Sequence, residues 1–363
     1  MNGTPHYDLA VVGAGIVGLA HAVAALRRRR SVVVVERSAA ITGATVRNFG
    51  HIAPSVQAGE ARELAERSRE LWLRLAGRAG FWLRESGTLV AARAEDELAV
   101  LEEAGEGVLL SGAEIAGRAP LRGAVGGAFL PRDLQLDPRE AGPALARFLA
   151  DSGVAFRWRT SALGAEPGLL HTTRGSLRAE AIVIAVNADV DQLFPRTAER
   201  HGVERCRLDM LLTEGVGLGA PLLTGTSLLR YGAFAAQPSA GAVRARLAAQ
   251  APELLQRDVN EMYAERPDGS LVLGDTHAVD AAAPPFQEEA AFALLLRLGE
   301  SAFGRPLAVR ERWQGVYATA AQDFLRTPIA DGVQLVSVTT GTGMTTGLGL
   351  GESVIEKLWG VST

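Results

Sequence analysis

The sequence predicts an α/β (α+β) protein in which a discontinuous Rossmann-like domain carries an inserted, mostly antiparallel β-sheet domain. Three features support this fold class. A glycine-rich turn, Gly13–Gly18, joins a predicted strand to a predicted helix near the start of the chain. A second glycine-rich run, Gly341–Gly351, follows a buried strand near its end. Between them, Arg200–Asp280 carries short strand patterns separated by turns, which is typical of an antiparallel sheet.

The start of the chain is predicted to form one β-α-β unit. Tyr7–Val12 and Ser31–Glu36 are short apolar runs of strand-forming residues, and Gly18–Arg30 between them is predicted to be a helix. Leu9–Leu26 contains no charged residue, but glycines interrupt it and its flanks differ from a signal peptide, so we expect no membrane span. The basic run Arg27–Arg30 is expected to complement the negative end of the helix dipole rather than to bind nucleic acid.

Hydrophobic periodicity and turn residues predict the remaining elements. Helices are predicted at Glu60–Gly80, Glu95–Ala104, Pro138–Ser152, Ala290–Phe303 and Ser353–Leu358. Strands are predicted at Leu83–Ala92, Val154–Trp158, Leu169–Thr173, Leu177–Arg178, Ala181–Val186, Met210–Thr213, Glu261–Tyr263, Ser270–Leu273, Ala308–Tyr317 and Val333–Val338. This order assigns residues 1–80, 138–200 and 318–363 to the Rossmann-like domain, and residues 81–137 and 201–317 to the inserted one.

Composition narrows the class of protein. The chain has 363 residues, of which 47% are hydrophobic and 21% charged, so it is long enough for two domains with sizeable cores. Its formal net charge of −4 gives no general attraction to nucleic acid or to anionic membranes. The single cysteine, Cys206, can form neither an internal disulfide nor a cysteine-based metal site, and we expect no bound metal. These features favour a cytoplasmic protein and leave its oligomeric state open.

The turn Gly13-x-Gly15-x-x-Gly18 has the spacing of a dinucleotide site. Gly13 permits a tight turn, Gly15 lets a pyrophosphate approach the backbone, and Gly18 lets the helix pack closely on the strand. The free N–H groups and partial positive charge at the helix N-terminus then favour the phosphates. Glu36 ends the next strand, where an acid hydrogen-bonds a ribose hydroxyl, and this acid disfavours the 2′-phosphate of NADP.

Two further segments indicate that the cofactor is larger than a simple nicotinamide dinucleotide. The run Gly341–Gly351 joins a buried strand to a second predicted helix start, and a turn of this kind at the far end of the chain suits FAD, with the helix dipole near the flavin ring. The segment Thr42–Ile52 has no simple periodicity and is predicted to be a loop that runs along the pyrophosphate toward the reactive ring. Together they move the prediction from a general dinucleotide to FAD.

These motifs resemble those of the D-amino-acid oxidase, glycine oxidase and sarcosine oxidase superfamily of flavoproteins. The resemblance spans almost the whole chain and includes YDLAVVGAGIVGLAHAVAAL, AIVIAVNADV, GSLVLGDTH, RWQGVY and VSVTTGTGMTTGLGLGE. More narrowly, ATVRNFGHI, ARELAERSRELWLRLA, RCRLDMLLTEG and LLRYGAF resemble a clade associated with phosphonate breakdown. The resemblance implies oxidation of an amine by hydride transfer to flavin N5. The resulting imine hydrolyses to an aldehyde, and oxygen or another acceptor reoxidises the flavin.

The superfamily's cofactor contacts carry over to matching positions of this chain. They are Gly13, Ala14, Gly15, Ile16, Val17, Gly18, Glu36, Arg37, Thr45, Arg47, Asn48, Gly50, His51, Ser161, Ala162, Asn187, Gly315, Gly341, Gly343, Met344, Thr345 and Thr346. Branches that attach FAD to cysteine place that cysteine near the C-terminal glycine turn. Cys206 is expected to lie far from this turn, which predicts non-covalent FAD.

The chain also departs from the superfamily. In the glycine oxidase branch an arginine holds the substrate carboxylate shortly after Trp-x-Gly, whereas here Trp313-Gln314-Gly315 leads to Val316 and Tyr317. The sarcosine oxidase branch has a lysine near the flavin, and the only lysine of this chain is Lys357, in the last predicted helix. The missing arginine weakens the case for a simple amino acid as substrate. The missing lysine leaves oxidase and dehydrogenase both open, with oxidase favoured.

The clade resemblance implies an aminophosphonate substrate, such as 2-aminoethylphosphonate or its N-methyl or hydroxy derivatives. An anionic phosphonate favours arginine, because its planar fork binds oxyanions bidentately. The candidate catalytic residues are His51, Arg230, Tyr263, His277 and Tyr317, with Tyr231 beside Arg230. Two alternatives stay open: oxidation of an N-methylated or cyclic amino acid (sarcosine, glycine or proline type), and a flavin-binding subunit without catalysis.

Overall fold

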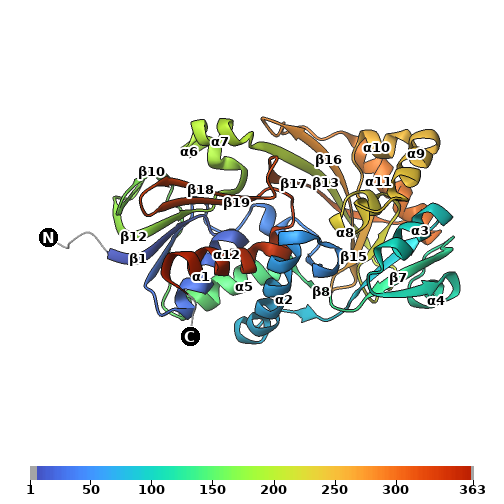
Figure 1. Cartoon of the computed structure of the whole chain (residues 1–363), viewed down its shortest axis with the longest axis horizontal. Helices are drawn as coiled ribbons and strands as arrows, with labels where there is room; N and C mark the ends of the chain where they lie inside the picture. The colour runs from blue at the N-terminus through green and yellow to red at the C-terminus, as the bar shows by residue number, and fades with distance from the viewer. Residues whose placement is uncertain (1–5, 361–363) are drawn as a thin grey trace.

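The protein has two parts that lie side by side, each built on a large β-sheet (Figure 1). This computed structural model describes residues 6–360. The N-terminal strand, the first helix and the last helix all belong to one part, although they come from opposite ends of the chain. The middle of the chain builds most of the other part.

The first sheet has a parallel centre with antiparallel additions. Its strands are β1 (His6–Val12), β2 (Val32–Val35), β9 (Ala155–Arg157), β10 (Ala162–Glu166), β11 (Leu169–Thr172), β12 (Leu177–Ile184), β18 (Phe324–Ala330) and β19 (Val333–Val338). β1 lies between β2 and β12 and pairs with both in parallel, and β19 joins β12 in parallel. The predicted β-α-β unit is therefore confirmed. Four of these strands, β1, β2, β12 and β19, are buried apolar runs, as expected for a sheet covered on both faces.

Helices α1 (Ile16–Arg27), α2 (Gly59–Ala79), α5 (Pro138–Asp151) and α12 (Gly343–Trp359) gather on one face of this sheet (Figure 1). The contact between α1 and α12 is very close, since a Cβ atom added at Gly351 would lie 2.6 Å from the backbone carbon of Ala20. At the end of α1, Arg27 and Arg28 both pair with Glu352 of α12. Part of the basic run therefore joins two helices in addition to facing the helix dipole.

The second sheet has the strand order β17-β13-β16-β15-β14-β5-β7-β6, and of its pairings only β14 with β5 is parallel. Its strands are β5 (Thr88–Ala92), β6 (Val108–Ser111), β7 (Gly126–Leu130), β13 (Glu204–Glu214), β14 (Leu222–Thr224), β15 (Met262–Glu265), β16 (Ser270–Asp280) and β17 (Val309–Thr319). The predicted mostly antiparallel sheet is confirmed. A small sheet of β3 (His51–Ile52), β8 (Leu134–Leu136) and β4 (Leu83–Arg84) accompanies the two large ones.

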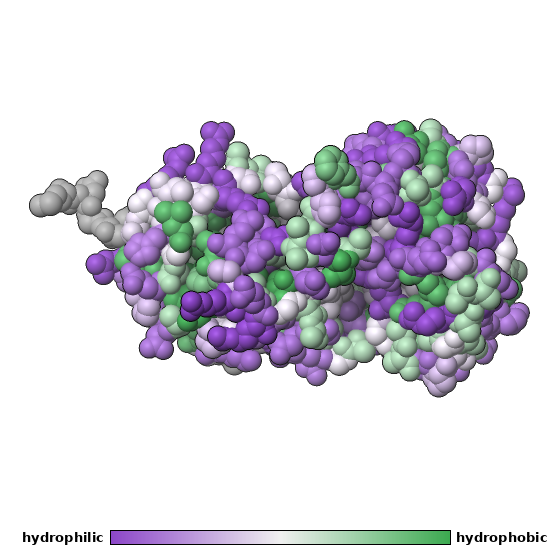
Figure 2. Space-filling view, turned by 90° about the horizontal axis from the view of Figure 1, so that it is seen from above, coloured by the Kyte–Doolittle hydropathy of each residue, from purple (hydrophilic) through white to green (hydrophobic). Residues whose placement is uncertain are grey.

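The remaining helices complete the structure around these sheets. They are α3 (Glu95–Ala104), α4 (Gly112–Arg118), α6 (Val190–Leu193), α7 (Pro195–His201), α8 (Gly232–Ala235), α9 (Ala240–Gln250), α10 (Pro252–Gln256) and α11 (Glu289–Phe303), with 3-10 turns η1 (Ala44–Val46), η2 (Pro54–Val56), η3 (Asn187–Asp189) and η4 (Gly225–Leu229). Within residues 6–360, no helix is long and apolar enough to cross a membrane. On the face seen from above, polar residues interrupt the apolar patches (Figure 2).

Several predicted boundaries were wrong. α1 begins at Ile16 rather than Gly18, and α12 begins at Gly343 rather than Ser353, because the small glycines of the second run let this helix pack against its neighbours. The predicted strand Leu83–Ala92 is divided between two sheets. Its break includes Gly87, which has a positive φ of 63°, and a Cβ atom added there would lie 2.5 Å from the Phe129 ring, so glycine is strongly favoured.

Candidate active site

A cleft of about 710 Å³ runs along the carboxyl ends of the parallel strands toward the second sheet. The glycine turn after β1, the loop after β2, the end of β12, strand β17 and the start of α12 all contribute to its walls. Ligands of open α/β sheets bind outside the carboxyl ends of the strands, so this cleft has the expected position for a cofactor.

The turn after β1 forms a cradle that only glycine fits. Gly13 has φ 104°, and a side chain there would collide with the backbone oxygen of Ala185 at the end of β12. A side chain at Gly18 would collide with the oxygen of Gly13, so the first turn of α1 lies directly on the loop. Gly15 is the N-cap residue of α1, and it has no side chain that could cover the N-terminus of the helix. These residues fit a dinucleotide pyrophosphate, which needs bare backbone beside a helix N-terminus.

Glu36 is fixed at the wall of this cleft. Its Oε2 accepts a hydrogen bond from Ala14 N at 2.9 Å, and its Oε1 accepts one from Ser38 N at 2.8 Å. Thr45 acts in a similar way on the helix, because its Oγ1 accepts a hydrogen bond from Ile16 N at 2.8 Å. The predicted ribose acid therefore lies beside the phosphate turn, held by backbone groups on both sides.

The loop that contains Arg47 and Asn48 is braced from within and from β17. Asn48 Nδ2 donates to the oxygens of Ala44 and Thr45, and its Oδ1 accepts from Gly50 N. Arg47 Nη1 donates to the oxygen of Gln314 on β17 at 3.0 Å. The loop therefore has one defined path along the cleft, and it contacts the second sheet directly.

The C-terminal turn closes the other side of the cleft. Gly341 has φ 77°, and a Cβ atom added there would lie 2.9 Å from Cζ of the Tyr317 ring. Thr345 Oγ1 donates to the oxygen of His51 and accepts from Ala53 N, so the first turn of α12 is tied to β3. Thr346 Oγ1 donates to the oxygen of Thr342, the residue that precedes α12.

Most of the predicted cofactor residues line the cleft. They are Gly13, Gly15, Ile16, Val17, Glu36, Arg37, Thr45, Arg47, Asn48, Ser161, Ala162, Asn187, Gly315, Gly341, Gly343 and Met344. The other predicted residues support the walls without being part of the lining: Ala14, Gly18, Gly50, His51, Thr345 and Thr346. Of the candidate catalytic residues, Tyr317 lines the cleft.

Tyr317 connects the cleft to a buried polar cluster on the second sheet. Its Oη accepts a hydrogen bond from Arg230 Nη2 at 2.8 Å, and Arg230 Nη1 donates to Asp258 Oδ2 at 2.9 Å. The His277 ring meets the Tyr317 ring edge-on, with 6.5 Å between centroids. Burial raises the pKa of Tyr317 well above its usual value, so its hydroxyl stays protonated. Arg230, which directly follows η4, thus meets His277 of β16 and Tyr317 of β17 at one point beside the cleft.

The cluster also contains Asp275, which the sequence analysis missed. Asp275 is 4% exposed, and its Oδ2 lies 3.5 Å from Nε2 of His277. Burial raises the pKa of Asp275 to about 7, and burial lowers the pKa of His277 well below its usual value. Asp275 and His277 are two residues apart on β16, and this D-x-H spacing was the signal that could have revealed the pair.

Two candidate catalytic residues lie elsewhere. The ring of His51 bonds through Nε2 to Thr88 Oγ1 at 2.6 Å, and burial lowers its pKa to about 3. Tyr263 donates from Oη to Glu261 Oε1 at 3.1 Å and packs edge-on against Phe303. Neither side chain lines the cleft: Tyr263 belongs to the apolar core of the second part, and the ring of His51 faces Thr88 on β5.

Cys206 is closer to the C-terminal turn than its sequence position led us to expect. It is the cross-strand partner of Tyr317, whose ring contacts Gly341. The antiparallel pairing of β13 and β17 produces this proximity, which sequence separation concealed. Cys206 is buried and is not part of the cleft lining.

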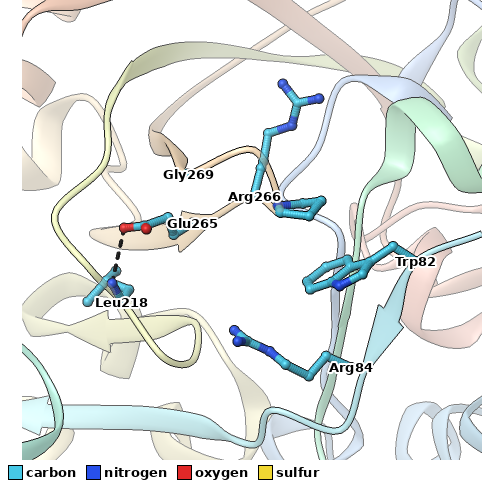
Figure 3. Close-up of a pocket in the computed structure, with 7 residues that line it drawn as sticks. Trp82, Arg84, Leu218, Glu265, Arg266 and Gly269 are labelled. Atoms are coloured by element: carbon cyan, nitrogen blue, oxygen red, sulfur yellow. Dashed lines mark hydrogen bonds between the residues drawn. The ribbon is translucent and has the colours of Figure 1, made fainter.

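A second hollow, of about 280 Å³, shares no lining residue with this cleft. Figure 3 shows the residues around it. It is lined by Trp82, Arg84, Leu218, Glu265, Arg266, Pro267 and Gly269. Glu265 Oε2 accepts three backbone hydrogen bonds from the loop at residues 216–218, and Arg266 pairs with Asp137. These charges stabilise the surrounding loops, so the larger cleft is the candidate active site.

The cradle, the ribose acid and the polar cluster at the end of one cleft define a dinucleotide-binding oxidoreductase. The chain matches the family described as DAO, FAD dependent oxidoreductase, over residues 8–357. It therefore belongs to this family, it is an enzyme, and its cofactor is FAD. Among curated proteins, none matches the chain in sequence.

Solved structures share the whole fold at low sequence identity. Glycine oxidase from Geobacillus kaustophilus is 20% identical with a TM-score of 0.79, covering 99% of this chain and 96% of that one. L-proline dehydrogenase from P. horikoshii is 17% identical with a TM-score of 0.80, covering 98% and 94%. L-alpha-glycerophosphate oxidase from Mycoplasma pneumoniae, solved with FAD bound, is 17% identical with a TM-score of 0.73, covering 97% and 95%.

Proposed function

We propose that this protein oxidises an aminophosphonate, such as 2-aminoethylphosphonate or its N-methyl or hydroxy derivatives. The observation that carries the proposal is Arg230, a guanidinium hydrogen-bonded to Tyr317 at the edge of the FAD cleft. Its side chain is 23% exposed, and its partner Asp258 is 65% exposed. The guanidinium group is thus mostly buried, whereas the carboxylate of Asp258 is exposed and can turn toward solvent when another anion binds to Arg230.

A phosphonate suits this arrangement because it presents three oxygens. Arg230 offers a planar fork of donors, and the neutral Tyr317 hydroxyl offers another donor once Arg230 Nη2 turns to the ligand. A bidentate contact with a charged group contributes about 1.5 to 3 kcal/mol for each hydrogen bond. The only lysine, Lys357, lies in the last turn of α12, so arginine is the residue type that supplies positive charge here.

The amine end must be positioned so that the carbon–hydrogen bond beside its nitrogen can react. Bound FAD supplies a two-electron acceptor for the carbon–hydrogen bond beside the nitrogen. Arg230 fixes the anionic end of the substrate, and Tyr317 and Gly341 shape the wall next to it. Fixing both ends in the right geometry converts an encounter into an intramolecular step, which is where most of the rate enhancement arises. The resulting imine hydrolyses to an aldehyde and an amine.

We also propose that the lining residues hold FAD without a covalent bond. Cys206 is buried behind Tyr317 and outside the cleft lining, so no thiol reaches the cofactor. We assign the cofactor-binding domain to residues 1–80, 138–200 and 318–363, and the substrate domain to residues 81–137 and 201–317. A small-molecule substrate and oxygen, or another electron acceptor, are the partners that this chemistry requires.

A second candidate is oxidation of an N-methylated or cyclic amino acid. Glycine oxidase and L-proline dehydrogenase, which share the fold, act on compounds of this kind by their names. Against it, Val316 and Tyr317 follow Trp313-Gln314-Gly315 on β17, so that strand offers no arginine for a carboxylate beyond the glycine. In this second candidate, Arg230 is the residue that binds the carboxylate of the amino acid.

The test is an anaerobic screen of the yellow holoenzyme against aminophosphonates, sarcosine, glycine and proline, followed by admission of oxygen. We expect 2-aminoethylphosphonate or a derivative to bleach the flavin, and Arg230→Ala to lower kcat/KM about 100-fold, or about 2.7 kcal/mol. Arg305→Ala removes an exposed ion pair with Glu214 and serves as the matched control. Bleaching by amino acids alone would reject the aminophosphonate. Bleaching by no amine at all would favour a flavin-binding subunit, and the speed of colour return separates oxidase from dehydrogenase.

A further inference from the structure

The contact between Asp275 and His277 depends on whether a proton lies between the carboxylate and the imidazole ring. His277 Nδ1 lies 2.7 Å from the backbone oxygen of Asp258. A carbonyl oxygen only accepts, so Nδ1 must carry the proton of the neutral ring. The other nitrogen, Nε2, then presents a lone pair, and it faces Asp275 Oδ2 at 3.5 Å. Two acceptors that face each other at this distance repel unless a proton lies between them.

The surroundings of the pair hold it in place and set its charge. Asn260 Nδ2 donates to Asp275 Oδ1 at 3.0 Å, and the backbones of Asn260 and Asp275 exchange two hydrogen bonds of 2.8 Å. The side chains of Asp275 and His277 are 6% and 4% exposed. Bulk water therefore has little access, and a proton that enters the pair is shared between these two side chains.

The charged and titratable groups around the pair come from every neighbouring element. They are Arg230 at the end of η4, Tyr231 before α8, Asp258 after α10, Cys206 on β13 and Tyr317 on β17. Arg230 stabilises an ionised Asp275, Asp258 opposes it, and burial raises its pKa to about 7. The tyrosines and the thiol keep their protons, since burial raises the pKa of each.

We infer that Asp275 and His277 form a proton-accepting pair that receives the proton of the substrate ammonium group before the amine is oxidised. The inference rests on the proposed function in that the substrate is an amine, but it requires no particular amine. Arg230 and His277 both contact Tyr317, which lines the cleft, so a zwitterion bound at this wall has a cation for its anionic end and a proton acceptor for its ammonium end behind the same tyrosine.

The proton transfer balances without any other reactant. The resting pair, with Asp275 ionised and His277 neutral, carries one negative charge. One N–H bond of the ammonium group breaks, its electron pair stays on nitrogen, and one new bond to hydrogen forms on the pair. The pair becomes neutral and the amine becomes neutral, which frees the nitrogen lone pair to stabilise the imine that follows. The proton returns to solvent after product release.

Asp275→Asn tests the pair, because it keeps the size of the side chain and removes its charge. In anaerobic stopped-flow experiments with the amine that reduces the flavin, the wild-type rate should rise with pH through about 7 as the pair loses its proton. At pH 7 the flavin of the variant should be reduced about 100-fold more slowly than that of the wild type, which is the size of effect expected when a general base is removed. Near pH 10, where an amine begins to lose its own proton, its rate should recover to within about tenfold of wild type.

Asp209→Asn is the matched control, since Asp209 is another buried carboxyl on the adjacent strand, hydrogen-bonded to Thr276 and outside the pair. It should keep the wild-type pH profile. An independent reading comes from ¹⁵N-histidine NMR of the holoenzyme, in which the resonance lost in His277→Gln identifies His277. Its Nε2 shift should titrate near pH 7 in wild type and should not do so in Asp275→Asn.

The outcomes separate this inference from the proposed function. If amino acids and not aminophosphonates bleach the flavin, the proposed substrate fails and the pH profiles test the pair on the active amine. If no amine bleaches it, the NMR titration still decides whether the two side chains share a proton, and a flat titration rejects the pair. A wild-type rate and pH profile in Asp275→Asn would overturn the inference outright.

Discussion

Arg230 and Tyr317 meet through a hydrogen bond of 2.8 Å, with Nη2 of the arginine donating to Oη of the tyrosine. Tyr317 also lines the FAD cleft and contacts Gly341 at the start of the C-terminal turn. This one contact therefore joins the cofactor site of the first part to the polar cluster of the second. It places a permanent positive charge one side chain away from the cleft lining.

Asp258→Asn should strengthen the binding of anions. Asp258 is exposed and pairs with Arg230, so an incoming phosphonate must displace it. Removing the carboxylate charge should lower the inhibition constant of methylphosphonate, which has no amine to oxidise, about three- to tenfold, or about 0.7 to 1.4 kcal/mol. The measurement is competition against the reducing amine. An unchanged constant would show that Asp258 does not compete for Arg230, and Asp280→Asn provides a control on an exposed acid of the same region.

Tyr317→Phe should weaken substrate binding without changing the shape of the pH profile. The phenol holds Arg230 in place, and the loss of a hydrogen bond to a charged group costs about 1.5 to 3 kcal/mol. We expect kcat/KM to fall at least about tenfold, with the flavin still bound. Because burial raises the pKa of Tyr317, the wild-type pH profile should show no tyrosine ionisation below pH 10, and the variant should keep the same profile shape.

Two helical glycines should respond to alanine in opposite directions. A side chain at Gly18 would collide with the oxygen of Gly13, so Gly18→Ala should lower the free energy of unfolding by about 3 kcal/mol and release FAD. Gly77 in α2 faces open space, so Gly77→Ala should raise the free energy of unfolding by about 0.5 to 1 kcal/mol. Chemical unfolding and the flavin absorbance of the purified proteins measure both effects. Retention of FAD by Gly18→Ala would contradict the assignment of the cradle.

Glu261 should make the protein less stable as pH rises. Burial raises its pKa to about 7 in the folded protein, above its ordinary value of 4.5. Its contribution to stability is therefore fully present below about pH 4.5 and is lost as the pH rises through about 7. Glu261→Gln stays neutral and can still accept the hydrogen bond from Tyr263, so it should remove about 1 to 3 kcal/mol of this pH dependence. Unfolding free energies at pH 5 and pH 8 give the comparison, and equal slopes in the two proteins would disprove it.

The sequence by itself determined the cofactor half of the protein. Gly13, Gly18 and Glu36 lie within one β-α-β unit, so local spacing alone brings them together, and the structure places them around one cleft. The helix over residues 95–104 and the strand over residues 333–338 were predicted to the residue, because their apolar periodicity is strong and their ends carry turn residues.

The polar cluster, by contrast, was decided only by the tertiary structure. The Asp275–His277 pair, Tyr317 and Arg230 come from three segments far apart in the chain. The pairing of β13 with both β16 and β17 brings the pair close to Tyr317, and a hydrogen bond joins Arg230 to that tyrosine. His51 illustrates the opposite case: it follows the cofactor loop in sequence, yet β3 turns its ring toward Thr88 and away from the cleft. Local periodicity encodes which residues form an element, whereas the register between distant strands encodes which side chains meet, and that register is a property of the packed fold.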